Sequence, residues 1–112
     1  MAGSLERGDV CLCAFPQPDK PRPVLVLTRS SAIRYLARVT VAPITSSIRD
    51  VPSEVRLDVE DGMRQPCVVN LHNLVTVSKT RLGPRLARLG VIKMESVCNA
   101  MDFALGCEKR KA

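Results

Sequence analysis

Long hydrophobic runs are absent from this sequence. No apolar stretch approaches the roughly 20 residues that a helix needs to cross a bilayer, so we expect no membrane-spanning segment. The N-terminal stretch 1–7 contains no hydrophobic segment resembling a signal peptide. Internal repeats and low-complexity segments are also lacking. These features predict a cytoplasmic protein.

Metal ligands are scarce as well. The chain has a single histidine, and its five cysteines lie mostly inside apolar segments, where they behave as small hydrophobic residues. A zinc site needs paired Cys or His ligands at loop-like spacings, whereas Cys11 and Cys13 fall on one predicted strand. We therefore predict no metal site and no cofactor, and we expect reduced thiols, as is usual in the cytoplasm.

The net charge of +6 comes from 17 Lys and Arg against 11 Asp and Glu. Such an excess favours an anionic partner, either nucleic acid or an acidic peptide. Lys109-Arg110-Lys111 contributes to it, and we interpret 107–112 as a solvated basic tail rather than a binding arm. A chain of 112 residues has room for one domain, which we place at 1–112 with its core at about 7–106.

Short apolar or alternating segments predict a mainly β fold. The segments expected to form strands are 9–15, 24–28, 38–44, 54–59, 67–72, 74–77 and 85–89. Residues 16–21 form a proline-rich connection too short for a helix, so the first two strands should be adjacent and antiparallel. In the segment 54–59, charged residues alternate with aliphatic ones that should point inward.

One helix is predicted near the C-terminus. Met94, Val97, Cys98, Met101 and Leu105 recur at helical spacing, and Gly106 should end the helix. Short strands with one closing helix indicate a small antiparallel, barrel-like sheet of the α+β type.

Arg22 lies between two prolines and opens a strand. Pro21 and Pro23 restrict the local backbone, so the Arg22 side chain projects from a rigid segment of the main chain. The strand ending at Thr45 leads into the hydroxyl cluster Thr45, Ser46 and Ser47. A permanent cation and hydroxyl donors together suggest a phosphate-binding site.

Several ordered motifs resemble the MazF and PemK family of bacterial toxins. Arg7-Gly8-Asp9-Val10 matches the RGD-plus-aliphatic start of that family, the segment 22–26 its RPVLV motif and the segment 41–46 its VAPITS motif. The stretch from Val68 to Gly83 and the predicted helix resemble later family segments. The resemblance covers about 7–106, and ordered motifs over such a span are far more specific than any one alone.

The resemblance implies a twisted antiparallel sheet closed like an SH3 barrel, as in MazF, PemK and CcdB. It further implies a symmetric homodimer that cleaves single-stranded RNA at short sequences without a metal ion, as the toxin of a toxin–antitoxin system that inhibits translation and growth. The cognate antitoxin would cover the RNA groove with an acidic, disordered tail, a role that suits the basic net charge.

Arg22 and Thr45 are the residues predicted to act on the phosphate. Arginine does not deprotonate in practice, so it would hold the phosphate and stabilise the charge of the transition state. Thr45 occupies the position of the family's functional threonine, and its neutral hydroxyl would donate hydrogen bonds rather than act as a base. Ser46 and Ser47 are its weaker companions. Without the resemblance, a surface arginine and a turn-capping threonine would be the simpler interpretation.

His72 departs from the family, which commonly has Asp or Glu at this position. An imidazole transfers protons near neutral pH, so His72 is a candidate general acid or base; an exposed or base-contacting histidine is the equal alternative. Asn70 precedes it on the same predicted strand face, while Asn73 and Val75 replace the usual Gln and Arg. The remaining residues predicted to bind RNA are Phe15, Gln17, Lys20 and Thr76.

Two other functions stay open at this stage. CcdB-type proteins are similar in fold but poison a topoisomerase by binding it, without nuclease chemistry, and fold alone does not separate the two classes. The third possibility is a catalytically inactive RNA-binding member whose sequence has diverged from the family at Asn70, His72 and Val75. The sequence does not give the cleavage motif, the class of RNA or the identity of the antitoxin.

Overall fold

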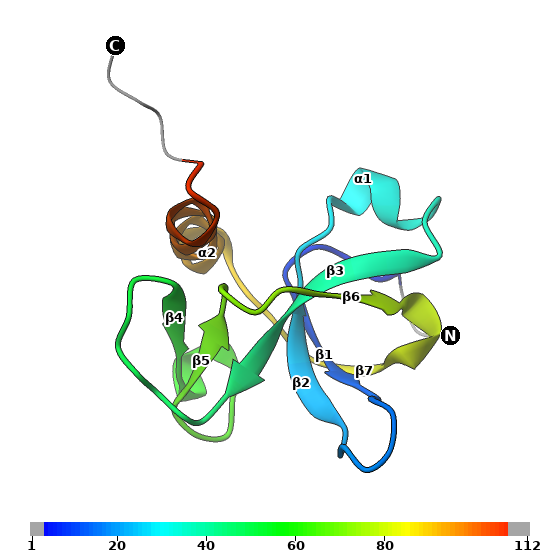
Figure 1. Cartoon of the computed structure of the whole chain (residues 1–112), viewed down its shortest axis with the longest axis horizontal. Helices are drawn as coiled ribbons and strands as arrows, with labels where there is room; N and C mark the ends of the chain where they lie inside the picture. The colour runs from blue at the N-terminus through cyan, green and yellow to red at the C-terminus, as the bar shows by residue number, and fades with distance from the viewer. Residues whose placement is uncertain (1–3, 108–112) are drawn as a thin grey trace.

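One seven-stranded antiparallel sheet organises residues 4–107, which are the residues described by the computed structural model (Figure 1). The basic tail predicted for 107–112 lies outside them except for Cys107. The strands are β1 (Asp9–Cys13), β2 (Arg22–Val26), β3 (Arg38–Thr45), β4 (Glu54–Leu57), β5 (Cys67–Asn70), β6 (Val75–Ser78) and β7 (Leu82–Arg88). The helices are α1 (Ser30–Ile33) and α2 (Val91–Leu105), with short 3-10 turns η1 (Val59–Asp61) and η2 (Lys79–Arg81).

The strand order is β4-β5-β3-β2-β1-β7, and β6 pairs with β3 outside this path. The long strand β3 therefore pairs with β2 on one edge and with β6 and then β5 on the other. Strand β3 therefore connects two parts of the sheet, one formed by β1, β2 and β7 and the other by β4 and β5 (Figure 1). The predicted antiparallel neighbours β1 and β2 are confirmed, as is a mainly β fold with a C-terminal helix.

Two apolar clusters fill the two faces of the sheet. Helix α2 packs Val97 and Ala100 onto one face, together with aliphatic residues of β1 to β5. The second cluster lies on the other face and includes Cys11, Cys13, Val24, Val26, Ile33, Val39, Val41 and Val77. Alternate residues of β2 and β3 supply both clusters, as the two-residue period of a strand requires.

Helix α2 ends where it was predicted to end. Gly106 adopts a left-handed backbone with φ 69°, and the amide of Cys107 donates to the carbonyl of Asp102 at 2.9 Å. The helix begins at Val91, before the periodic pattern starts. Leu105, predicted to share the buried stripe, is 58% exposed. Within residues 4–107, no helix combines the length and apolarity needed to span a membrane.

Several strand boundaries differ from the sequence-based expectation: β1 ends at Cys13 rather than at 15, β5 ends at Asn70 rather than at 72, and β7 begins at Leu82 rather than at 85. Strand β2 begins at Arg22 rather than Val24, since Arg22 pairs with Cys13 of β1. Strand β4 ends at Leu57, and Val59, expected to point inward, is 65% exposed. The side chain and backbone of Asp58 begin the η1 turn by bonding with Val59 and Asp61, and this local capping overrides the alternating pattern.

Candidate nucleic-acid interface and active site

Arg22 and Thr45 lie on two neighbouring strands just beyond the point where the strands stop pairing. The last paired residues of β2 and β3 are Val24 and Pro43, and Arg22 and Thr45 each lie two residues beyond them on the diverging ends (Figure 1). Pro23 and Pro43 lack the N–H groups that would extend the ladder. Because the side-chain period is two, Arg22 and Thr45 leave the sheet from the same face as Val24 and Pro43.

The guanidinium of Arg22 is exposed and uncompensated. The three ion pairs among the described residues involve other arginines and a lysine, and no hydrogen bond to the Arg22 side chain is present there. Its paired neighbour Cys13 supplies no counter-charge, because burial raises the pKa of that thiol and keeps it neutral at neutral pH. The full charge of Arg22 is therefore available to an anionic ligand.

Thr45 is half-buried, and its hydroxyl has a defined orientation. The backbone N–H of Ser47 donates to Thr45 Oγ1 at 3.1 Å, which occupies one acceptor site of the hydroxyl. This local turn leaves the hydroxyl proton free to be donated to a ligand. Ser46 and Ser47 follow the end of β3 and are exposed. Thr45 can thus serve as a hydrogen-bond donor to a phosphate oxygen.

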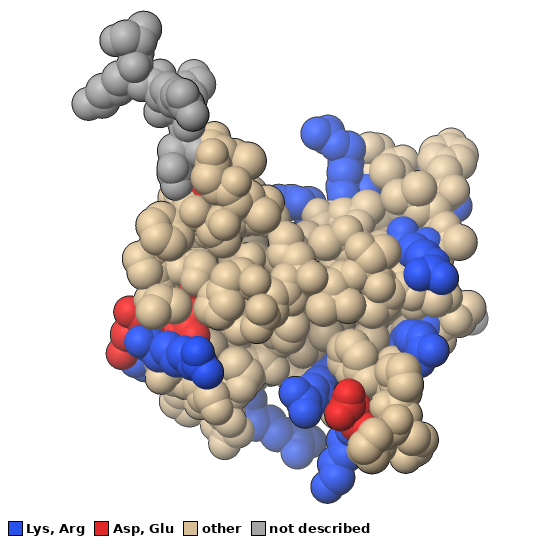
Figure 2. Space-filling model, viewed as in Figure 1, with Lys and Arg blue, Asp and Glu red and all other residues tan. Residues whose placement is uncertain are grey.

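The surface between the diverging strand ends is notched and basic. Figure 2 shows Lys and Arg side chains in and beside a notch at the lower edge of the molecule. In Figure 1, the β1–β2 connection lies on one side of that edge and the ends of β3, β4 and β5 lie on the other. We call the region between the β1–β2 connection, which leads to Arg22 at the start of β2, and the end of β3 at Thr45 the basic notch. A polyanionic strand fits its charge.

Asn70, the last residue of β5, lies on the same face as Thr45, and His72 follows it in the turn between β5 and β6. Val68 pairs directly with Thr45, so Asn70, two residues further, lies diagonally across from it on the same face. The side chain of Asn70 accepts a hydrogen bond from the backbone N–H of His72 at 3.1 Å. The ring Nδ1 of His72 lies 2.5 Å from Oγ of Ser53, while the residue itself is exposed.

Some of the other predicted RNA-binding residues lie beside the notch and others do not. Gln17 and Lys20 are exposed on the β1–β2 connection, next to Arg22, whereas Phe15 is half-buried and packs against the second apolar cluster. Asn73 is exposed in the turn between β5 and β6. Thr76 is not brought to the other residues: it pairs with Thr40, whose side chain leaves β3 from the face opposite to Thr45.

Three residues that contact or neighbour these groups were not predicted from the sequence. Ser53 contacts His72, and Glu54 Oε1 accepts the backbone N–H groups of Arg49 and Asp50 at 3.0 and 2.9 Å, which ties the β3–β4 connection to β4. Arg56 is the third: it pairs with Val68, the neighbour of Thr45, and adds an exposed cation to that face. The alternation in 54–59 indicated that Arg56 points outward, but only the strand pairing shows which residues it neighbours.

No thiol or metal-binding cluster competes with these groups in the described residues. Burial raises the pKa of Cys11 and Cys67 as well as that of Cys13, so these thiols are poor nucleophiles at neutral pH. Residues 4–107 also hold no group of three or more His, Cys, Asp or Glu side chains placed to bind a metal ion. The chemistry that this surface offers is that of a guanidinium, hydroxyls, amides and one imidazole.

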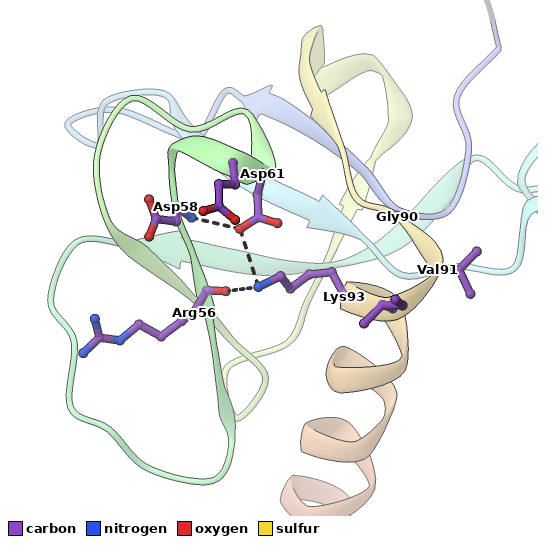
Figure 3. A pocket seen from close by; sticks show the side chains of 8 residues that line it. Arg56, Asp58, Asp61, Gly90, Val91 and Lys93 are labelled. Atoms are coloured by element: carbon purple, nitrogen blue, oxygen red, sulfur yellow. Dashed lines mark hydrogen bonds and ion pairs between the residues drawn. The ribbon is translucent and has the colours of Figure 1, made fainter.

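A shallow pocket lies elsewhere, at the start of α2 (Figure 3). Its volume is about 600 Å³, and Lys93 spans it. Lys93 Nζ donates to the carbonyl of Arg56 at 2.9 Å and lies 3.5 Å from Asp61 Oδ2. These contacts join α2 to β4 and η1, so the pocket is part of the packing of the helix onto the sheet rather than of the basic notch.

Comparison with known proteins gives one consistent family. Residues 6–105 match the model of the PemK-like, MazF-like toxins of type II toxin–antitoxin systems. The chain is 39% identical over 104 residues to the probable endoribonuclease MazF5 of Mycobacterium tuberculosis, covering 92% of this chain and 94% of that protein. It is 40% identical over 91 residues to endoribonuclease MazF3 of the same species, covering 78% and 88%.

Solved structures agree with the sequence comparison. The Mycobacterium tuberculosis toxin MazF-mt6 superposes with a TM-score of 0.83 at 33% identity, covering 90% of this chain and 99% of that one. A mycobacterial endoribonuclease in complex with its cognate antitoxin superposes with a TM-score of 0.84 at 25% identity, covering 96% and 100%. The similarity thus extends over the whole sheet and α2.

Proposed function

Because this chain belongs to the PemK-like, MazF-like toxins of type II toxin–antitoxin systems, we propose that its basic notch binds and cleaves single-stranded RNA. The chain is an endoribonuclease toxin, as its relatives are. The proposal goes further in locating the reaction: Arg22 and Thr45 act on the scissile phosphate, and the RNA itself supplies the nucleophile. No metal ion is required in this scheme.

The observation that carries the proposal is the pairing of an uncompensated cation with a free hydroxyl donor. Arg22 has no counter-ion among the described residues, and the hydroxyl of Thr45 is oriented by Ser47 so that its proton is available. The two side chains leave the two diverging strand ends from the same face. A phosphodiester between them would receive a charge-assisted contact from one side and a neutral hydrogen bond from the other.

The reaction follows from these contacts. The 2′-oxygen of the RNA forms a bond to phosphorus and its proton passes to water, while the bond to the 5′-oxygen breaks. Arg22 stabilises the negative charge that grows on the phosphoryl oxygens, and Thr45 orients the same group. His72 in its imidazolium form is the proposed proton donor: the proton on Nε2 passes to the departing 5′-oxygen and leaves a neutral ring with its proton on Nδ1. The products are a 2′,3′-cyclic phosphate and a 5′-hydroxyl end.

The family and the basic net charge of the chain together indicate its binding partners. We propose a homodimer in which the notch of each protomer contributes to one RNA-binding surface. An antitoxin with an acidic, disordered C-terminal segment would neutralise the basic notch by occupying the path of the RNA. Both partners would meet the chain in the cytoplasm, where its RNA substrate is found. Cleavage at a defined short sequence would follow from contacts made by Gln17, Lys20, Asn70 and Asn73.

The test is cleavage of a defined pool of single-stranded RNA by the purified protein in EDTA. We expect cleavage of RNA at a short sequence with cyclic-phosphate ends, and no cleavage of the same sequence as DNA, which lacks the 2′-hydroxyl. Replacing the single ribose at the cleavage site by deoxyribose should protect that site alone. Sequencing the 5′ ends of the fragments would define the motif.

The alternatives give different results in the same assay. A CcdB-like poison would leave the RNA intact and would bind a topoisomerase. An inactive RNA-binding member would retard the RNA in a gel without cutting it. Cleavage of the deoxy-substituted site, or cleavage that stops when divalent metal is removed, would contradict the proposed chemistry.

A further inference from the structure

Ser53 is a buried hydroxyl placed against the only histidine of the chain. Its residue is 6% exposed, and its Oγ lies 2.5 Å from Nδ1 of His72. The carbonyl of Ser53 also accepts the backbone N–H of Leu71 at 2.8 Å, which continues the pairing of β4 with β5. Ser53 is therefore fixed by the sheet, and its hydroxyl reaches His72 from the inside of the molecule.

His72 is held at a second point as well. Its backbone N–H donates to Oδ1 of Asn70 at 3.1 Å, which closes a tight turn at the end of β5. The ring is thus restrained through Nδ1 by Ser53 and through the backbone by Asn70. Nε2 has no hydrogen-bond partner within residues 4–107, and the residue is exposed. The free nitrogen is the one that a bound ligand can reach.

We propose that Ser53 is a positioning residue for RNA cleavage, because its hydroxyl holds the His72 ring with Nε2 toward the bound RNA. This inference rests on the proposed function and deepens it. Ser53 does not touch the RNA in this scheme; it acts by removing the freedom of a side chain that would otherwise rotate in solvent.

A hydroxyl suits this position because it can form a hydrogen bond with Nδ1 of His72 whether or not that nitrogen carries a proton. When Nδ1 is unprotonated, the Ser53 O–H donates to it, which also satisfies a buried donor that has no other partner among the described residues. When Nδ1 carries a proton, Ser53 Oγ accepts it. In the imidazolium that acts as the acid, and in the neutral ring left after Nε2 gives its proton to the 5′-oxygen, Nδ1 is protonated and Ser53 Oγ accepts from it; in the resting neutral ring with a proton on Nε2, the Ser53 O–H donates to Nδ1 instead. The ring therefore keeps its orientation in all three states, whereas a carbonyl would hold only the two with a protonated Nδ1.

The first test needs neither RNA nor activity. Since the chain has one histidine, ¹⁵N-labelled protein gives one pair of ring-nitrogen resonances. We expect the neutral ring of the parent protein to occupy one tautomer, with a proton on Nε2. In S53A, the two nitrogens should shift toward the averaged values of an imidazole that is free in water. Averaged values in the parent protein itself would overturn the proposal.

The second test measures kcat and KM on the oligonucleotide cleaved by the parent protein. S53A should lower kcat about 10-fold with little change in KM, a smaller loss than the 10²-fold or more expected on removing an acid–base group in H72Q. S53T, which keeps the hydroxyl, should recover most of the rate, and S96A on the exposed side of α2 is the matched serine control. In the H72Q background, S53A should have no further effect.

The outcomes separate this inference from the proposed function. A full additional loss for S53A in the H72Q background would show that Ser53 acts on the fold and not through His72, which would overturn the inference. H72Q cutting as fast as the parent would remove the proposed role of His72 in the reaction, and the inference about Ser53 with it, while leaving cleavage by Arg22 and Thr45 standing. Melting curves of each variant exclude global unfolding as the cause.

Discussion

At the residue scale, the proposed RNA cleavage depends most on Arg22. The two prolines beside it fix the backbone, and the absence of a counter-ion among the described residues leaves its charge for a ligand. Arg22 was identified from the sequence as a candidate site residue, because the two flanking prolines and the strand that follows are both local features. Its position relative to Thr45 was not predictable, because that depends on where β2 and β3 stop pairing.

Replacing Arg22 should therefore affect catalysis and not stability. R22A should lower kcat by about 10²- to 10³-fold, the usual loss on removing one group that stabilises transition-state charge. R22K should recover only a part, since lysine keeps the charge but not the planar fork. R38A is the matched control, because Arg38 is also the first, exposed residue of a strand but lies at the other end of β3 from Thr45. Single-turnover cleavage measures the effect; a fully active R22A would refute this assignment.

The contact between His72 and Ser53 was not predictable from the sequence near either residue. The sequence marked His72 as unusual because it is the only histidine in the chain. No pattern links it to Ser53, which is 19 residues away and meets it only because β4 pairs with β5. Thr76 is the opposite case, since its residue type suggested RNA binding but the pairing with Thr40 places it on the other face.

At the element scale, the turn between η1 and β5 is fixed by one glycine. Gly62 has φ 94°, and a Cβ at this position would lie 2.9 Å from the Cβ of Ala87 on β7. Both the left-handed backbone and the close approach exclude a side chain. The turn therefore packs against β7, which lies far from it in the sequence. The sequence predicted an acidic turn here but gave no sign of its contact with β7.

G62A should destabilise the protein by about 2–3 kcal/mol, from the cost of a left-handed backbone and of overpacking. G106A is the matched control: Gly106 has φ 69°, but a Cβ added there would meet no other atom within 4 Å, so only the backbone cost of about 1 kcal/mol remains. Urea unfolding measures both values. Equal losses for the two variants would show that the contact with Ala87 is not limiting.

At the scale of the whole molecule, the fold was largely predictable and the surface only partly. Short alternating segments and one amphipathic helix led to the correct class, because burial of apolar faces decides it. The inward orientation expected for Val59 was wrong, because capping by Asp58 ended β4 early. The notch itself arises from long-range pairing of β3 with three strands, which no local pattern encodes.

The buried thiols predict how stability depends on pH. Burial raises the pKa of Cys11, Cys13 and Cys67 above the ordinary 9.0, so the folded state keeps them protonated where the unfolded chain would ionise. Their contribution to stability is complete below about pH 9 and is lost as pH rises through the folded-state values. The free energy of unfolding in urea should fall as the pH rises above about 9, and fall less in C11A/C13A/C67A; an equal decline in both proteins would exclude the thiols as its cause.

The central claim is that Arg22 and Thr45 act together on one scissile phosphate. A double-mutant cycle tests it most directly, with single-turnover cleavage of the same oligonucleotide by the parent protein, R22A, T45A and R22A/T45A. Residues that act as a unit give non-additive losses. We predict that the double variant loses much less than the product of the two single losses. Strictly multiplicative losses would contradict the account, because they would mean that the two side chains act independently.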